Sequence, residues 1–192
     1  DASGTLGGSG VIGTLTASAR VAPGASPGAL TCSNAYFSSA GTLVIDLDNN
    51  VPGAGYDQLR ARGAVGLTNT TLQVLAAFSP GYDVRVGDQF VIIDNDGSDP
   101  VIGGFSGFPN HSEFTAGGDY RLRIDYDGGS GNDVVLTVVG VPASAVSGSL
   151  FAGNGNHLLD PNECNHLVLV ISNTSATAMT GLSARLWTTN EE

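Results

Sequence analysis

The chain contains no lysine, and its 192 residues include only one methionine, one tryptophan and two cysteines. Just 13% of the residues are charged, with seven arginines against eighteen acidic residues and a net charge of −11. Because phosphate backbones and anionic lipids repel such a chain, binding to nucleic acid or to a membrane surface is not expected. No apolar run reaches the ~18 residues that a membrane-spanning helix needs, so membrane insertion is not expected either.

Helical periodicity is also missing. Instead, 28 glycines and 8 prolines separate short segments in which apolar and polar residues alternate. This pattern predicts an all-β chain of short strands and tight turns. The clearest strands are Thr42–Asp48, Asp119–Asp127 and Val134–Val139. Further strands are expected at Val11–Arg20, Ala29–Cys32, Tyr56–Ala61, Ala64–Thr68, Thr71–Ala77, Tyr82–Val86 and Gln89–Asp94.

Residues 4–139 carry an ordered series of short motifs: GTLGGSGVIGTLTASARVAPGASPGALT, GTLVIDL, YDQLRARGAVGLTNTTLQV, VGDQFVIIDND, GGFSGFP and DYRLRIDYDGGSGNDVVLTVV. This series resembles the closing part of bacterial passenger domains built from autotransporter-associated β-strand repeats. The resemblance implies a right-handed parallel β-helix, or β-solenoid, that is secreted or displayed on the bacterial surface. The alternation by itself would equally permit a sandwich or a barrel.

The amino-acid composition changes after Gly140. Residues 141–149 are small and are interpreted as a linker, and residues 150–192 are similar to the opening strands of an immunoglobulin-like sandwich of secreted bacterial proteins. His166–Ile171 and Leu182–Thr188 would be two of its strands. Such a sandwich needs about seven strands. We therefore expect material excised from a longer protein, completion by a neighbouring subunit, or a tail packed on the solenoid of residues 1–140.

One loop of the tail carries the best candidate for a metal site. Its potential oxygen ligands, in the order of an EF-hand-like loop, are Asn154, Asn156, the Leu158 carbonyl, Asp160 and Glu163. Ala152 stands where the first carboxylate is expected, and His157 replaces the glycine of the turn. Calcium is the expected ion if this loop binds one, and the alternative is an Asn/Gly turn before a strand. No other cofactor is expected.

Two further acidic turns have a weaker pattern. Gly128–Val135 matches a single copy of a calcium-binding nonapeptide, which needs a tandem copy to complete its cage. Asp94–Asp99 places three carboxylates around a glycine, as many ordinary turns do. Both are interpreted as turns.

The composition favours an extracellular setting, since the chain is acidic, without lysine and rich in small polar residues, and the resemblance implies a bacterial one. Cys32 and Cys164 can pair as a disulfide in that setting, or remain unpaired in two separate modules. Both alternatives stay open.

No arrangement of residues indicates catalysis. Asp46 with Asp48, and Arg121 with Arg123, alternate along strands as in polysaccharide-degrading β-helix enzymes, but charged pairs on a solvated strand face are ordinary. We therefore expect a non-catalytic structural protein: a surface stalk, an adhesin passenger or a self-assembling fibre subunit. The rival hypothesis is a module that binds glycans or a host surface. Its aromatic contacts would be Tyr36, Phe37, Tyr56, Tyr82, Phe105 and Phe108.

Overall fold

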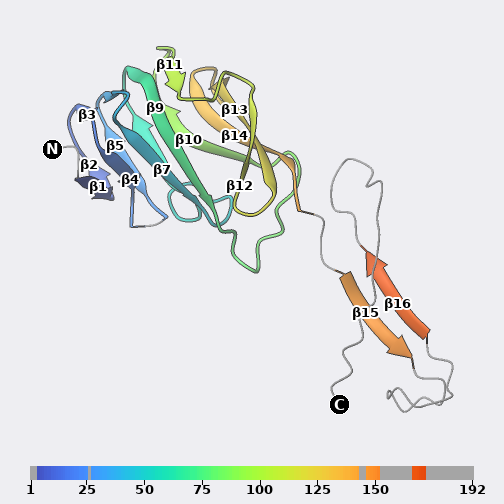
Figure 1. The fold of residues 1–192 in the computed structure, drawn as a ribbon. Coiled ribbons are helices and arrows are strands. Elements are labelled where there is room, and N and C mark those ends of the chain that lie inside the picture. The colour runs from blue at the N-terminus through green and yellow to red at the C-terminus, as the bar shows by residue number, and fades with distance from the viewer. Residues whose placement is uncertain (1–3, 26, 143–145, 152–165, 172–192) are drawn as a thin grey trace. The chain divides into compact units, whose positions relative to one another are not determined.

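A computed structural model describes residues 4–25, 27–142, 146–151 and 166–171, the last two segments as backbone only. The chain divides into two compact units, Asp1–Pro142 and Ala143–Glu192, and each is considered by itself. Every regular element in the described residues is a strand (Figure 1). No described segment forms a helix of the length and apolarity that crossing a membrane requires.

The described residues of the first unit form fourteen strands. They are β1 (Thr5–Gly8), β2 (Gly10–Val11), β3 (Leu15–Ala17), β4 (Arg20–Pro23), β5 (Ala29–Cys32), β6 (Ala35–Phe37), β7 (Thr42–Leu47), β8 (Gln58–Ala61), β9 (Val65–Ala76), β10 (Gln89–Asn95), β11 (Ile102–Phe105), β12 (Glu113–Ala116), β13 (Tyr120–Gly128) and β14 (Asp133–Gly140).

One of its two sheets is curved and parallel throughout, in the order β1-β4-β7-β9-β6-β3, and β11 also pairs with β9. Strand β9 joins the two halves of this sheet, because its first residues pair with β6 and its last six pair with β7. Between them Asn69 has a φ of 53°. Asparagine tolerates this left-handed conformation better than most residues, which lets one strand serve two partners.

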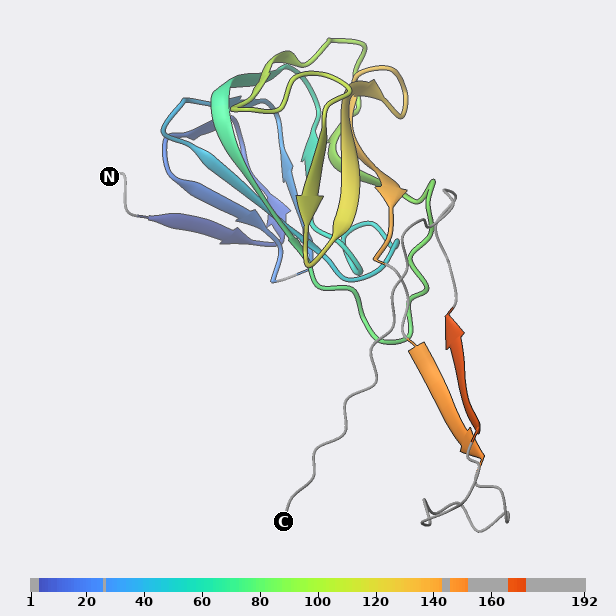
Figure 2. The same ribbon diagram turned by 45° about the vertical axis from the view of Figure 1, so that its right-hand side comes forward.

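The second sheet is mixed. Strands β2, β5, β8 and β10 pair in parallel, and β10 is then followed by the antiparallel strands β14, β13 and β12. The two sheets thus begin together at β1, β2 and β3, at one end of the unit, while the antiparallel strands lie at the other end (Figures 1 and 2).

A single core fills the space between the sheets. Alternate residues of β7, including Leu43 and Ile45, have no exposed surface, and the same holds for Leu122 and Ile124 of β13. Their branched apolar side chains suit a pleated surface that is covered on one face. The core continues from Leu15 near the first strands to Val138 in the last strand.

The expected right-handed β-solenoid over residues 1–140, followed by an immunoglobulin-like sandwich, is wrong. Parallel pairing gives way to an antiparallel meander at β12, β13 and β14. The connections there are short tight turns, with positive φ at Gly117, Gly118 and Asp119 before β13 and at Gly129 and Gly131 before β14. Turns this short join antiparallel neighbours, whereas consecutive parallel strands need a longer crossover.

In the second unit the described residues form one antiparallel pair, β15 (Val146–Phe151) with β16 (His166–Ile171). β15 begins inside the segment 141–149, which the sequence predicts to be a linker. β16 coincides with the predicted strand His166–Ile171, and the predicted strand Leu182–Thr188 lies outside the described residues. The described part of this unit is thus one antiparallel strand pair and does not form a sandwich.

Candidate functional site

The predicted calcium loop lies outside the described residues. This applies to Asn154, Asn156, Leu158, Asp160 and Glu163. Cys164 lies outside them as well. Its predicted partner Cys32 is fully buried in the core and forms no disulfide with any described residue. The calcium site and the Cys32–Cys164 disulfide both stay predictions.

The other two acidic turns lie against each other. The Asn132 side-chain amide donates to the Gly97 carbonyl at 2.6 Å, and the backbone N–H of Asn95 donates to Asp133 at 2.8 Å. Asn132 and Asp133 are both buried. Their polar atoms therefore join the loop after β10 to the loop before β14. The sequence presents these turns as two separate motifs and gives no sign that they are in contact.

Most of the aromatic residues proposed for glycan contacts belong to the core. Phe37, Tyr56 and Phe105 are buried, and Tyr82 and Phe108 pack against the core cluster. Tyr36, at 44% exposure, is the exception. The rings of four of these residues contact other aromatic rings, as in the edge-on pair of Tyr56 and Phe90 with centroids 5.4 Å apart; the other three are Tyr82, Phe105 and Phe108. A buried ring cannot stack on a sugar, so this observation weakens the rival hypothesis.

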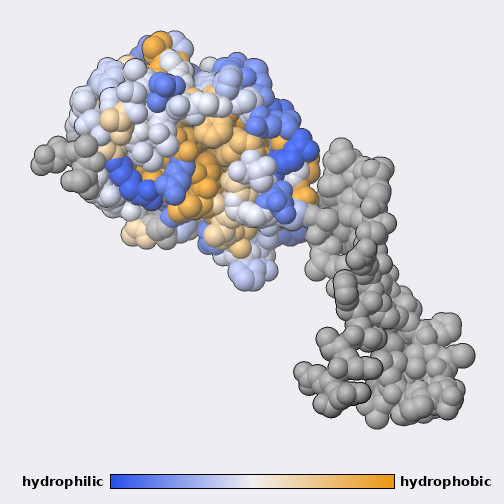
Figure 3. Space-filling model, viewed as in Figure 1, coloured by the Kyte–Doolittle hydropathy of each residue, from blue (hydrophilic) through white to orange (hydrophobic). Residues whose placement is uncertain are grey.

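An open groove of about 770 Å³ lies beside β11 and the loop that follows it. Its lining includes Asn69, Ile102, Phe108, Pro109, Asn110 and Tyr126. Figure 3 shows apolar residues in the middle of the visible face and hydrophilic residues around them. Apolar atoms also reach the surface near β11, in line with the 64% exposure of Ile102.

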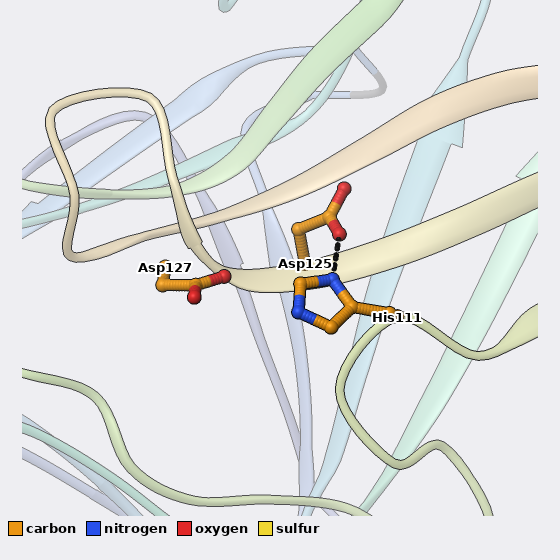
Figure 4. Close-up of side chains that lie close together, drawn as sticks. All are labelled: His111, Asp125 and Asp127. Carbon is orange, nitrogen blue, oxygen red and sulfur yellow. Dashed lines mark hydrogen bonds and ion pairs between the residues drawn. The ribbon is translucent and has the colours of Figure 1, made fainter.

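Beside this groove His111 lies between two carboxylates (Figure 4). One ligand atom from each of His111, Asp125 and Asp127 lies within 4.8 Å of the others, the one such group of metal-binding side chains in the part of the chain that the structure describes. His111 precedes β12, and the two aspartates are alternate residues of β13. The backbone N–H of His111 donates to the Ile124 carbonyl at 2.8 Å, which fixes the loop against β13.

The three side chains of this group differ in burial and in their charged neighbours. Burial alone would raise the pKa of Asp125, but hydrogen bonds from His111 and Arg123 outweigh burial and leave that pKa below its ordinary value. His111 Nδ1 lies 2.6 Å from Asp125 Oδ1, and the Arg123 guanidinium lies 3.2 Å from the same carboxylate. Asp125 is therefore a buried, ionised carboxylate, whereas His111 and Asp127 are exposed.

Sequence reasoning missed this group. Asp125 and Asp127 stand on one face of a strand, which alternation shows, but His111 is 14 positions from Asp125 and no motif links them. The charged pairs considered for catalysis lie in different sheets. Asp46 belongs to β7, and Arg121 and Arg123 of β13 form ion pairs with Glu113 and Asp125.

The open edges of β1, β2 and β3 form a second candidate site, called the first-strand edge from here on. In the part of the chain that the structure describes, each of the three strands is the last in its row and pairs with another strand on one side only. Leu15 N–H donates to Asn34, and the Ala17 carbonyl accepts from Ser38, so the peptide groups of Thr16 between them face the open side. Ile12 N–H donates to Thr31, which likewise turns Val11 outward.

Comparison with known proteins gives no match: no family model, no curated protein and no solved structure is similar to this chain. The chemistry of these residues is therefore the basis for any statement on function.

Proposed function

We propose that this chain is a non-catalytic structural segment of an extracellular bacterial surface protein, and that it associates with a second copy of itself through the first-strand edge. The observation that carries this proposal is the edge itself. Among the described residues, three consecutive strands pair on one side alone, at the same end of the unit, and such an edge is a template for further strand pairing.

The charge distribution supports a second copy as the partner. Although the chain has a net charge of −11, no charged residue occurs from Ala2 to Ala19. Two such edges can approach each other without charge repulsion. Many proteins place a lysine on an open strand to prevent pairing, and these three strands contain none. Val11 is 69% exposed and Leu6 is 38% exposed, so apolar surface accompanies the unpaired backbone.

At the opposite end β11 pairs with β9 alone among the described strands, but the last strand of the mixed sheet offers less opportunity. This edge strand, β12, carries Glu113, which forms an ion pair with Arg121 of β13. A charged pair on an edge strand opposes pairing with another chain. We therefore propose end-to-end association through one end of the unit, which forms dimers more readily than long filaments.

Sedimentation velocity of the full chain over a range of micromolar concentrations tests the proposal. The expected result is a concentration-dependent dimer that Val11→Lys and Thr16→Lys both abolish, because each places a charge on the first-strand edge. Leu75→Lys is the matched control, since Leu75 is 42% exposed but lies on β9, away from this edge. A chain that stays monomeric throughout, or a dimer that Leu75→Lys disrupts equally, would overturn the proposal.

A further inference from the structure

We propose that His111 and Asp127 bind a divalent transition-metal ion of the zinc class, and that Asp125 orients His111 for this role. The proposal concerns the β12–β13 end of the unit, so it does not depend on association through the first-strand edge. It also differs from the predicted calcium loop of the tail in its residues and in its metal.

Hydrogen-bond partners determine which nitrogen of His111 is available. The Asp125 carboxylate already accepts hydrogen bonds from the Arg123 guanidinium at 3.2 Å, and His111 Nδ1 lies 2.6 Å from Asp125 Oδ1, so Nδ1 is the nitrogen that carries the proton. The side-chain NH₂ of Asn110 can only donate, and it lies 3.2 Å from Nε2. Nε2 therefore presents a lone pair. A carboxylate that holds Nδ1–H while Nε2 binds the metal is the arrangement that orients metal-binding histidines in many proteins.

The same Asn110 NH₂ marks the position of the ion. It lies 3.4 Å from Asp127 Oδ1 as well as 3.2 Å from His111 Nε2, so one partly positive group bridges the two atoms that would be ligands. One hydrogen bond holds the other end of this amide, since Asn110 Oδ1 accepts from the backbone N–H of Tyr126 at 2.9 Å. A cation that binds between His111 Nε2 and Asp127 Oδ1 displaces this NH₂ group. The Asn110 side chain then turns away and gives up its hydrogen bond with Tyr126.

The donor set determines the class of metal. An imidazole nitrogen with a carboxylate oxygen suits zinc and its neighbours, whereas calcium and magnesium prefer oxygen ligands throughout. The Arg123 guanidinium holds the Asp125 carboxylate at 3.2 Å, and the Asp127 carboxylate lies in the same group. His111 has a side-chain exposure of 61%, and Asn110 and Tyr126 line the groove. Water or a ligand in the groove can therefore complete the coordination of the ion.

Titration of the full chain with Zn²⁺, followed by the ring ¹⁵N signals of His111, tests the proposal. These signals separate His111 from His157 and His166, and His111→Ala assigns them. The expected result is a saturable shift of Nε2 while Nδ1 keeps its proton. Asp127→Asn should weaken binding about tenfold or more, since it removes a ligand, and Asp125→Asn should weaken it about 10–100-fold through loss of orientation.

Asn110→Asp is the most discriminating variant, because the proposal predicts that it binds zinc more tightly than the wild type. This substitution removes the NH₂ group that occupies the position proposed for the ion and puts a carboxylate next to that position, so zinc affinity should increase. Asp119→Asn is the matched control for charge, because Asp119 is exposed in the turn before β13 and outside the group. Ring signals that do not respond to millimolar Zn²⁺, or equal affinities for wild type, Asp127→Asn and Asn110→Asp, would overturn the proposal.

Discussion

The Asp57 carboxylate accepts a hydrogen bond from the backbone N–H of Gly28, with 2.7 Å between Oδ1 and N, although the two residues are 29 positions apart. Its other oxygen accepts from the N–H of Asp46 at 3.0 Å. Asp57 is 1% exposed. Since Gly28 leads into β5 and Asp46 belongs to β7, one buried side chain ties the mixed sheet to the parallel sheet.

This contact predicts a pH dependence of stability. Burial raises the pKa of Asp57 from 3.8 to about 6, against the two N–H donors that lower it. Between these two pKa values the folded chain holds a proton that the unfolded chain has released. Stability contributed by Asp57 therefore increases as the pH falls from above 6 toward 4 and is lost as the pH rises through 6.

Asp57→Asn should make the free energy of unfolding depend less on pH over this range. The measurement is the urea midpoint across this pH range, followed by tyrosine circular dichroism, because all five tyrosines lie in Asp1–Pro142. The variant also loses one acceptor for the Asp46 N–H, so we expect lower stability at every pH. Parallel profiles for the variant and the wild type would contradict the assignment of the slope to Asp57.

Phe90 should be a main stabilising residue of the first unit. It is fully buried, and its ring contacts those of Tyr56 and Phe78, with centroids 5.4 and 5.7 Å away. Phe90→Ala should lower the free energy of unfolding by about 3–5 kcal/mol, as for other buried aromatics. Leu75→Ala, at a site that is 42% exposed, should change it by clearly less, about 1 kcal/mol or below. Similar urea midpoints for the two variants would contradict the packing described for Phe90.

Two adjacent glycines in the turn before β13 provide a matched pair. Both have positive φ, but a Cβ at Gly117 would lie 1.8 Å from the Ala76 carbonyl oxygen, whereas a Cβ at Gly118 would meet nothing within 4 Å. Gly118→Ala should cost about 1 kcal/mol from its backbone conformation. Gly117→Ala should cost clearly more, because β12 and the end of β9 must separate. Equal losses in thermal midpoint would show that these segments are not in close contact.

Cys32 should be unreactive in the folded chain. Burial raises the pKa of its thiol to about 11, so almost no thiolate is present at neutral pH, and the side chain has no exposed surface. Maleimide should label the Cys32 peptide only after denaturation, as read by mass spectrometry. Rapid labelling of native protein would contradict the burial, and a peptide that needs reductant before it labels would support the predicted disulfide instead.

Local pattern predicted strands better than it predicted their arrangement. Thr42–Asp48 corresponds to β7 and Val134–Val139 lies within β14, because alternation and β-branched residues are local signals. Val11–Arg20, expected as one strand, is divided among β2, β3 and β4. Two expected strands, Ala64–Thr68 and Thr71–Ala77, are nearly all of the single β9.

The direction of strand pairing and the long-range contacts could not be predicted from the sequence pattern. Tyr82–Val86, predicted to be a strand, is irregular, since the Tyr82 hydroxyl and the Arg85 N–H both bond to the Asp88 carboxylate and fold this segment into a loop. β12 gave no alternation strong enough to predict it. The group at His111 depends on the antiparallel pairing of β12 with β13, and an expectation of parallel strands gives no reason to place His111 beside Asp125.

Hydrogen–deuterium exchange of the full chain at low and high protein concentration tests the proposed association most directly. The account predicts that peptides covering β1, β2 and β3 become more protected as concentration increases, because their outward N–H groups gain partners, while β12 and β13 do not change. Unchanged exchange at the first-strand edge, or added protection confined to β12 and β13, would contradict it.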